Sequence, residues 1–308
     1  MSEHRIILIE NPARLSIHTG RLRLSREGMD DVHILPQDIA VLVLHHHTIQ
    51  LTVNVLRVLG LAGSIILTTD DKHHPSAITM PYYGAPIQSQ RLRQQIKCQQ
   101  EGREAYVWQR IIQCRIRGQA ENLRRLVNKG ALRLERMAEQ VQPADYTKLE
   151  GQAARHYWAH LFPAGASRVK QGAEDLTNVR LNFGYAILRS LIARELVAVG
   201  LNPALGVGHV SQENPFNLAD DFLECYRYLV ERHVFRYSDC TEFNPQERKK
   251  LAAVVQENVT LGKETFRLTS AVAETVASFC RWLDKGKDKG KGKGKGKGKG
   301  ELRVPHLE

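Results

Sequence analysis

The pattern of apolar residues changes once along this chain of 308 residues, close to Gln88. Before that point, short β-branched runs are separated by turns, and the run from Ile39 to Leu44 is continuously apolar, as in strands buried on both faces. Beyond it, apolar residues recur every three or four positions, which is typical of helices with one buried face. The sequence therefore predicts an α+β protein, with a mainly β domain over residues 1–88 and an all-α domain over residues 89–283.

Within the first region, three segments set the expected topology. Residues 15–24 alternate around Thr19-Gly20, which predicts a hairpin. Residues 51–61 have helical spacing and end at Gly60 and Gly63, and residues 64–68 form another apolar run. We therefore expect a small β domain with one crossover helix. In the second region, the expected helical segments are 90–140, 146–161, 175–199, 217–234, 246–261 and 263–283.

The end of the chain is a Lys-Gly tract. Between Lys285 and Gly300, eight Lys and one Asp contribute +7 to the formal net charge of +11. Such a composition cannot bury an apolar surface, so residues 284–308 are expected to be a disordered tail. Residues 301–308 contribute a further −1, so without residues 285–308 the chain carries a charge of only +5. That surplus suits a polyanionic partner such as nucleic acid, but an ordinary solvated surface explains it equally well.

Cysteine usage and the absence of long apolar stretches indicate where the chain works. The five cysteines are odd in number and show no CxxC pair, which favours a reducing compartment over a disulfide framework or a zinc ribbon. The apolar run Ile6–Ile9 is too short for a signal sequence, and no stretch reaches membrane-spanning length. We therefore expect a cytoplasmic protein with no membrane partner.

Four side chains in the helical region have the chemistry of a metal centre. Asp221 and Glu224 are three residues apart, so they share a face of the expected helix, for which Asn217 is a natural N-cap. Glu150 lies on the expected helix 146–161, and His209 follows the glycine-rich sequence Gly206-Val207-Gly208. Two or three carboxylates and an imidazole, with no nearby Cys, suit Mg²⁺ or Mn²⁺ better than zinc.

Each of these residues also has a simpler interpretation. Acids at a helix start compensate the helix dipole and are well solvated, which could account for Asp221, Glu224 and Glu150. His209 could be an ordinary loop histidine. The small pair Ala153-Ala154 favours close packing around Glu150, which is unusual for a solvated acid. The run His45-His46-His47 is expected to be a surface turn, because three consecutive side chains cannot face one ion.

Three motifs, in the same order along the chain, resemble those of one known family. Residues 149–158, LEGQAARHYW, resemble its EGxAAxxYW helix, and residues 178–188 resemble its N…LNYGYAxL helix. Gly208-His209 followed by residues 218–227 resembles GxxH…LAxDLxExxR. The family that these motifs resemble is the CRISPR-associated spacer integrase, which serves as the universal adaptation endonuclease. The resemblance covers residues 1 to 283. It departs mildly at Phe183, Phe222 and Cys225-Tyr226, and no departure removes an acid or the histidine. The chain looks most similar to members from systems whose effector is a single large nuclease.

The resemblance implies roles for particular residues. Glu150, His209 and Glu224 would be the catalytic residues and would coordinate Mg²⁺ or Mn²⁺, with Asp221 as a fourth ligand or behind the first three. Asn182 and Tyr185 would line the site. The Arg-rich part of the 90–140 segment is a candidate DNA track, although each of its arginines could equally be solvated surface; the residues concerned are Arg115, Arg117, Arg124 and Arg125.

The resemblance also implies an activity and partners. Such a protein inserts short foreign DNA segments into a CRISPR array by attack of a 3′-hydroxyl on a phosphodiester, and it acts on double-stranded and branched DNA. Family members form homodimers through their β domains, and a dimer of a small companion protein bridges two such dimers. The effector nuclease is a further candidate partner. Two alternatives stay open: a non-catalytic, basic helical DNA-binding scaffold, and a simple hydrolytic nuclease for branched DNA.

Overall fold

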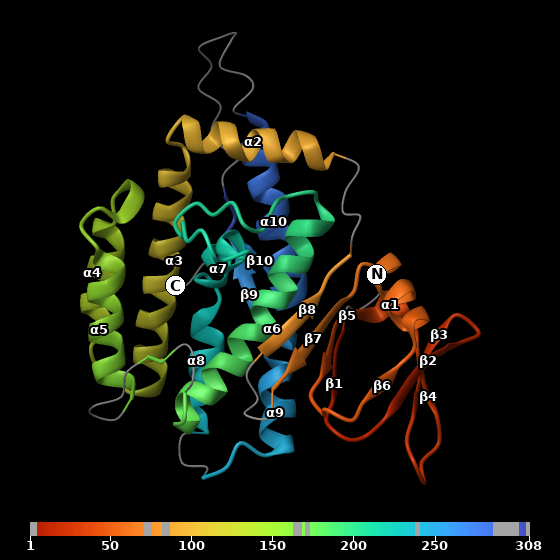
Figure 1. Cartoon of the computed structure of the whole chain (residues 1–308). Coiled ribbons are helices and arrows are strands. Elements are labelled where there is room, and N and C mark those ends of the chain that lie inside the picture. The colour runs from red at the N-terminus through yellow and green to blue at the C-terminus, as the bar shows by residue number, and fades with distance from the viewer. Residues whose placement is uncertain are drawn as a thin grey trace.

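The computed structural model describes residues 5–70, 75–81, 87–162, 168–169, 173–237, 241–285 and 302–305. In Figure 1, two small sheets at the N-terminal end lie beside a larger helical body, which confirms the α+β class. Within the described residues, no helix is both long enough and apolar enough to cross a bilayer.

The first sheet has the strand order β1-β5-β7-β8. Strands β1 (Arg5–Ile9), β5 (Ile39–Leu44) and β7 (Ile65–Thr69) are parallel, and β8 (Pro75–Thr79) is antiparallel to β7. Helix α1 (Val53–Leu61) connects β6 to β7, so the expected crossover helix is confirmed. Parallel neighbours require a connection of this kind.

The second sheet has the order β4-β3-β2-β6. Its strands β2 (Arg14–His18) and β3 (Arg21–Ser25) form the predicted hairpin, and β4 (Val32–Ile34) and β6 (Gln50–Leu51) complete it. At the turn, Thr19 and Gly20 both have positive φ angles, of 46° and 75°. Two left-handed residues match the twist of the flanking strands, which explains why a Gly follows Thr19.

Strand β5 is buried on both faces, as its apolar run predicts. Val41 and Val43 belong to the core shared with the helical body, whereas Leu42 and Leu44 belong to a separate core between the two sheets and α1. Alternate side chains of a strand point to opposite faces, so one strand serves both cores. The first sheet contacts the long helix α6 (Leu176–Ala198), which joins the two regions.

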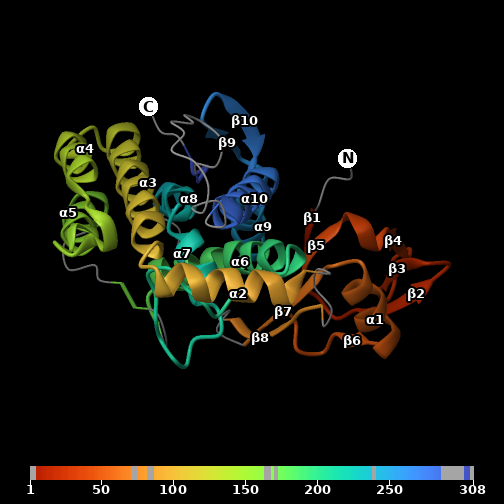
Figure 2. The same ribbon diagram turned by 90° about the horizontal axis from the view of Figure 1, so that it is seen from above.

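The helical body is built around α3 and α6. Gly102 and Gly130, both with positive φ, lie at the two breaks that divide the expected 90–140 segment into three helices. In Figures 1 and 2, α4 and α5 lie together on the side of α3 that faces away from the sheets. The remaining helices are α2 (Gln88–Gln100), α3 (Glu104–Leu126), α4 (Ala131–Gln140), α5 (Leu149–Leu161), α7 (Asn217–Leu223), α8 (Arg227–Arg236), α9 (Pro245–Ala252) and α10 (Leu268–Lys285).

The prediction of a helix over residues 246–261 is wrong in its second half. After α9 and a short 3₁₀ turn, β9 (Asn258–Leu261) and β10 (Glu264–Arg267) form an antiparallel hairpin. Gly262, with a φ of +65°, occupies the turn between them. The β-branched Val259 and Thr260 favour a strand, and Val259 is buried in the core of the helical body. Helix α10 consequently begins at Leu268 rather than at Lys263.

The prediction of a disordered tail over residues 284–308 is wrong for the described residues at its two ends. Helix α10 continues to Lys285, and Leu302 is buried in the main core. Arg303 pairs with Glu264 and Glu274, and Pro305 forms a β-bridge with Leu261. Residues 302–305 follow the Lys-Gly tract and include apolar side chains that can be buried. Residues 286–301 and 306–308 lie outside the described part of the chain.

Candidate functional site

Helix α3 presents one face to the region where the predicted site residues meet. Trp108, Arg115 and Asn122 are seven residues apart along α3, so they lie on the same side of the helix. Helix α3 contacts α4 and α5 along one side, and α7 and α8 along another. It therefore separates the helix that carries Glu150 from the segment that carries His209, Asp221 and Glu224.

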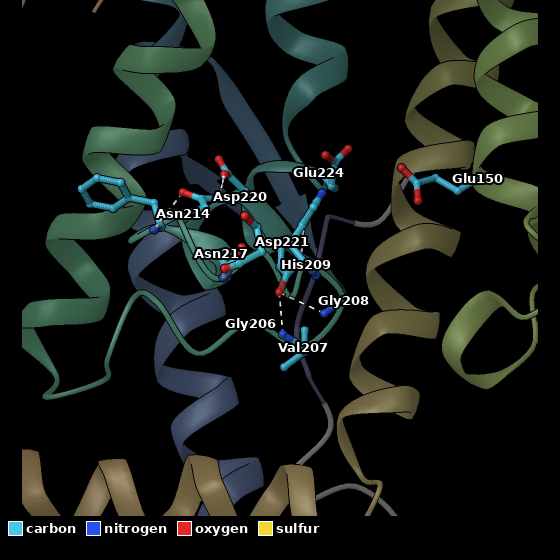
Figure 3. A network of polar contacts seen from close by, with 12 residues as sticks. Glu150, Gly206, Val207, Gly208, His209, Asn214, Asn217, Asp220, Asp221 and Glu224 are labelled. Atoms are coloured by element: carbon cyan, nitrogen blue, oxygen red, sulfur yellow. Dashed lines mark hydrogen bonds and ion pairs between the residues drawn. The ribbon is translucent and has the colours of Figure 1, made fainter. Parts of the chain in front are cut away.

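Glu150 lies in the first turn of α5. The Asp145 carboxylate caps this helix, because it accepts the backbone N–H groups of Leu149 and Glu150, each at 2.9 Å. Asp145 therefore satisfies N–H groups of the first turn of α5 that have no partner within the helix, and its negative charge lies at the positive end of the helix dipole. The Glu150 side chain is free for another role, and Figure 3 shows its carboxylate pointing toward Glu224.

Arg115 joins the two glutamates. Its Nη1 contacts Glu150 Oε1 and lies 2.9 Å from Glu224 Oε2. The Glu224 side chain is only 2% exposed, and its other oxygen accepts a hydrogen bond of 2.8 Å from Arg227 Nε. The contact between Arg115 and Glu224 is an ion pair without hydrogen-bond geometry. Glu224 Oε2 is therefore buried beside the Arg115 guanidinium but has no hydrogen-bond donor among the described residues.

Asp221 organises the loop that carries His209. Its carboxylate accepts the backbone N–H groups of Val207 (2.5 Å), Gly208 (3.1 Å) and His209 (2.9 Å), and it is fully buried. A fourth contact of 2.7 Å joins Asp221 Oδ1 to Nδ1 of the His209 ring. Figure 3 shows the loop wrapped around this carboxylate. Asp221 is therefore occupied by the loop and the imidazole.

The contact between Asp221 and Nδ1 orients the His209 ring. With Nδ1 directed at the Asp221 carboxylate, Nε2 is the ring nitrogen that can bind an ion when the ring is neutral. The hydrogen bond to Asp221 also raises the pKa of His209. A carboxylate that holds one imidazole nitrogen while the other faces an ion is a common arrangement around metal-binding histidines.

The glycines before His209 are required by close packing. A Cβ on Gly206 would lie 2.2 Å from the His209 carbonyl oxygen, and a Cβ on Gly208 would lie 2.3 Å from the Trp108 ring. Trp108 also meets the His209 ring edge-on, with ring centroids 5.6 Å apart. Trp108 was not among the site residues expected from the sequence. Its seven-residue spacing from Arg115 puts both side chains on one face of α3, but only the tertiary structure shows that this face meets the site.

The donor set fits a divalent ion, although the side chains do not form a metal cluster. Throughout the described ranges, no three His, Cys, Asp or Glu side chains lie close enough together to hold a metal. The cation between Glu150 and Glu224 is instead the Arg115 guanidinium. The oxygen of Glu224 without an aligned donor, the carboxylate of Glu150 and Nε2 of His209 are the kinds of group that bind Mg²⁺ or Mn²⁺.

Two details of the expected acidic segment differ in the structure. Helix α7 has Phe216 as its N-cap, and Asn217 is already inside the helix, so the predicted N-cap is wrong by one residue. The Asn217 amide donates instead to the carbonyl oxygens of Ala204 and Ser211, which tethers the loop around His209. Asp220 pairs with Arg189 and Asn214 and thus takes no part in the contacts of Asp221.

Tyr185 lies behind Glu224. Arg227, which holds Glu224, lies over the Tyr185 ring with its guanidinium carbon 4.5 Å from the ring centroid. The Tyr185 hydroxyl donates to Glu231 at 2.8 Å, and burial raises the pKa of both groups. Asn182 accepts from Arg168 at 2.6 Å. Both residues proposed to line the site are buried, and Tyr185 is connected to Glu224 through Arg227.

The four arginines proposed for DNA contact have different surroundings. Arg115 is committed to the two glutamates. Arg124 and Arg125 are exposed at the end of α3 and both pair with Glu121. Arg117 is half-buried on the same helix. The structure thus separates Arg115, which faces the site, from three arginines that remain candidates for a DNA surface.

Comparisons with known proteins agree with this fold. Residues 6–269 match the family described as CRISPR associated protein Cas1. The CRISPR-associated endonuclease Cas1 of Neisseria meningitidis serogroup C (strain 8013) is 31% identical over 281 residues, which cover 89% of this chain and 90% of that protein. A solved casposase bound to integration product has a TM-score of 0.75 at 16% identity, covering 92% of both chains.

A chain of a Cas6-RT-Cas1–Cas2 complex has a TM-score of 0.74 at 16% identity, and the match covers 93% of this chain and 35% of that chain. At such identities, the two structural matches establish a shared fold. The family match and the Neisseria relative each cover most of the sequence, including all four residues of the candidate site. The chain therefore belongs to the Cas1 family.

Proposed function

We propose that this chain is a metal-dependent DNA endonuclease and integrase that inserts short foreign DNA segments into a CRISPR array. The observation that supports it most is the meeting of Glu150 and Glu224 at one guanidinium, near a His209 oriented by Asp221. The endonuclease name of the Neisseria relative and the casposase match agree with nuclease and integrase chemistry. The new bond joins a 3′-oxygen to phosphorus, while the phosphorus–oxygen bond to the leaving 3′-oxygen breaks.

In this proposal, Glu150, Glu224 and His209 would hold a Mg²⁺ or Mn²⁺ ion, with Nε2 as the ligand atom that His209 offers. When bound, the ion would stabilise the negative charge that builds up on phosphate oxygens during transfer. Asp221 holds the His209 ring and the 207–209 backbone, because its oxygens are already occupied by four contacts. Arg227 fixes one oxygen of Glu224 and leaves the other directed toward the site.

The proposed partners are DNA, a second copy of this chain and Cas2. Casposase was solved with its integration product, and one structural match comes from a complex that contains Cas2. Strand β4 is an edge strand, and the apolar side chains of Met29, Val32 and Leu35 around it are exposed. An open edge with apolar neighbours supports dimerisation through the N-terminal domain.

The test is strand joining by the purified chain on branched DNA with a labelled, free 3′-hydroxyl. With Mn²⁺, Glu150→Gln and His209→Asn should each lower the joining rate by about a thousandfold, since each removes a proposed ligand. DNA affinity should change little. Glu139→Gln, an exposed acid on α4, is the matched control and should join at the wild-type rate.

Four outcomes separate the alternatives. If Glu150→Gln joins DNA as fast as the wild type, the assignment of Glu150 to the site is wrong. If the wild-type chain binds branched DNA but neither nicks nor joins it with Mn²⁺, the scaffold interpretation holds. If a blocked 3′-hydroxyl leaves DNA turnover unchanged, the protein is a hydrolytic nuclease rather than an integrase. Chelation of divalent ions should abolish joining by the wild-type chain, and unchanged joining would contradict the metal dependence.

A further inference from the structure

Arg115 holds its two acids less completely than the buried Arg180 holds Glu247. One nitrogen, Nη1, contacts both Glu150 and Glu224, and the buried Nε has no hydrogen-bond partner within the described residues. Arg180, by contrast, directs both Nε and Nη2 to Glu247 Oε2, at 3.3 and 3.0 Å. A two-pronged pair is the strong form of this interaction. The ion pairs of Arg115 are therefore of the weaker form, which can break more easily.

The Arg115 guanidinium supplies the positive charge between Glu150 and Glu224 that a metal ion would also supply. Glu224 is almost completely buried, and a buried carboxylate without a neighbouring positive charge is strongly disfavoured. A divalent ion and a guanidinium cannot occupy one position between the same two carboxylates, because they exclude each other by volume and repel each other by charge. One of the two must leave when the other is present.

We infer that Arg115 is a resident counter-cation which a divalent ion displaces from the position between Glu150 and Glu224. The inference rests on the metal site proposed above and adds a role for Arg115 within it. Arg115 stabilises the two acids while no metal is bound, and its departure is part of metal binding. Its side chain is already 13% exposed, so the released guanidinium moves outward, where a DNA phosphate is a suitable partner.

The inference predicts that removing the guanidinium makes the metal bind more tightly. Mn²⁺ affinity is measured by titration calorimetry on the full-length chain without DNA. Arg115→Gln should lower the dissociation constant for Mn²⁺ by about tenfold, because the guanidinium no longer competes with the ion for the two glutamates. Arg117→Gln is the matched control: it removes the same charge from the same helix, two residues away, and should change the constant by less than about twofold.

His209→Asn separates the two proposals in the same experiment. If the wild type and His209→Asn bind Mn²⁺ equally, the proposed metal site is wrong. If His209→Asn weakens binding but Arg115→Gln binds no more tightly than the wild type, the metal site stands and the displacement of Arg115 is refuted.

A second measurement uses the wild-type chain and does not depend on whether a variant folds. A dicarbonyl reagent that modifies accessible guanidinium groups is applied with and without saturating Mn²⁺, and the modified peptides are quantified by mass spectrometry. Labelling of Arg115 should rise severalfold with Mn²⁺, while labelling of the exposed Arg125 stays constant. Unchanged labelling of Arg115 at saturating Mn²⁺ would overturn the inference.

Discussion

The two regions of this protein differ in what they bury. Among the described residues, the only buried polar side chain of the N-terminal region is Ser64, which donates to the Ile39 carbonyl oxygen at 2.8 Å. All other buried polar and charged side chains belong to the helical region, from Arg91 onward. The sheets are therefore held by apolar burial, whereas the helical body encloses charges that each need a partner.

This difference shows how the candidate site is built. Buried ion pairs contribute little net stability, but removing one partner leaves a charge that is expensive to bury. Asp221 is the extreme case, because four donors converge on it, while Glu224 keeps one oxygen without an aligned donor. The helical interior thus contains a fixed part around Asp221 and an exchangeable part around Glu224 and Arg115.

The largest effect is expected at Asp221. Asp221→Ala leaves three backbone N–H groups and the His209 ring without their acceptor, which should lower the free energy of unfolding by about 4 kcal/mol. The measurement is urea unfolding followed by circular dichroism. The neighbouring Asp220→Ala is the control, expected to cost about 1 kcal/mol, because its partner Arg189 can turn toward water. Equal losses for the two variants would mean that the fixed part is no more tightly built than its surroundings.

A somewhat smaller effect is expected in the apolar region. Leu42 is completely buried between the two sheets, so Leu42→Ala should lower the free energy of unfolding by about 3 kcal/mol through lost burial and a cavity. Leu61→Ala removes the same atoms from a side chain that is 77% exposed and should cost less than about 0.5 kcal/mol. If both variants unfold alike, the core between the sheets is not what stabilises this region.

The contrast between the regions also decides how much of the fold is predictable from the sequence. Apolar periodicity is a local property, so the strand Ile39–Leu44 and the helix Leu176–Ala198 were both found. It failed at β9, where Val259 and Thr260 continue an apolar pattern that also fits a helix. The turn residue Gly262 was the signal for a hairpin, and only packing against α10 makes that choice definite.

The site was predictable in its residue types but not in its connections. The acids and His209 are recognisable from motifs, and Asp221 from its spacing to Glu224. Nothing in the sequence distinguishes Arg115 from the other arginines of α3, because its role depends on α5 and α7 being brought to the same helix face. A charge pair between residues far apart in the chain is a tertiary property, so sequence reasoning assigned Arg115 to a DNA surface.

A moderate effect is expected for the hydrogen bond behind the site. Tyr185→Phe removes the donor to Glu231, a side chain with almost no exposure, and should lower the free energy of unfolding by about 1.5 kcal/mol. Tyr106→Phe, a hydroxyl loss from an exposed tyrosine on α3, is the control and should cost almost nothing. A neutral result at Tyr185 would show that Glu231 finds another donor, so this part of the interior would be exchangeable too.

The smallest effect is expected where a charge of the helical region reaches the surface. Arg125 is 60% exposed, and Glu121 keeps Arg124 as a second partner when Arg125 is lost. Arg125→Gln should therefore change the free energy of unfolding by less than about 0.5 kcal/mol, as for other exposed ion pairs. The informative measurement is the salt dependence of DNA binding. If Arg125 contacts a phosphate, its loss should reduce the slope of log affinity against log salt by about 0.9. An unchanged slope with unchanged stability would leave Arg125 as solvated surface and would confine the DNA-contacting charges of α3 to its other arginines.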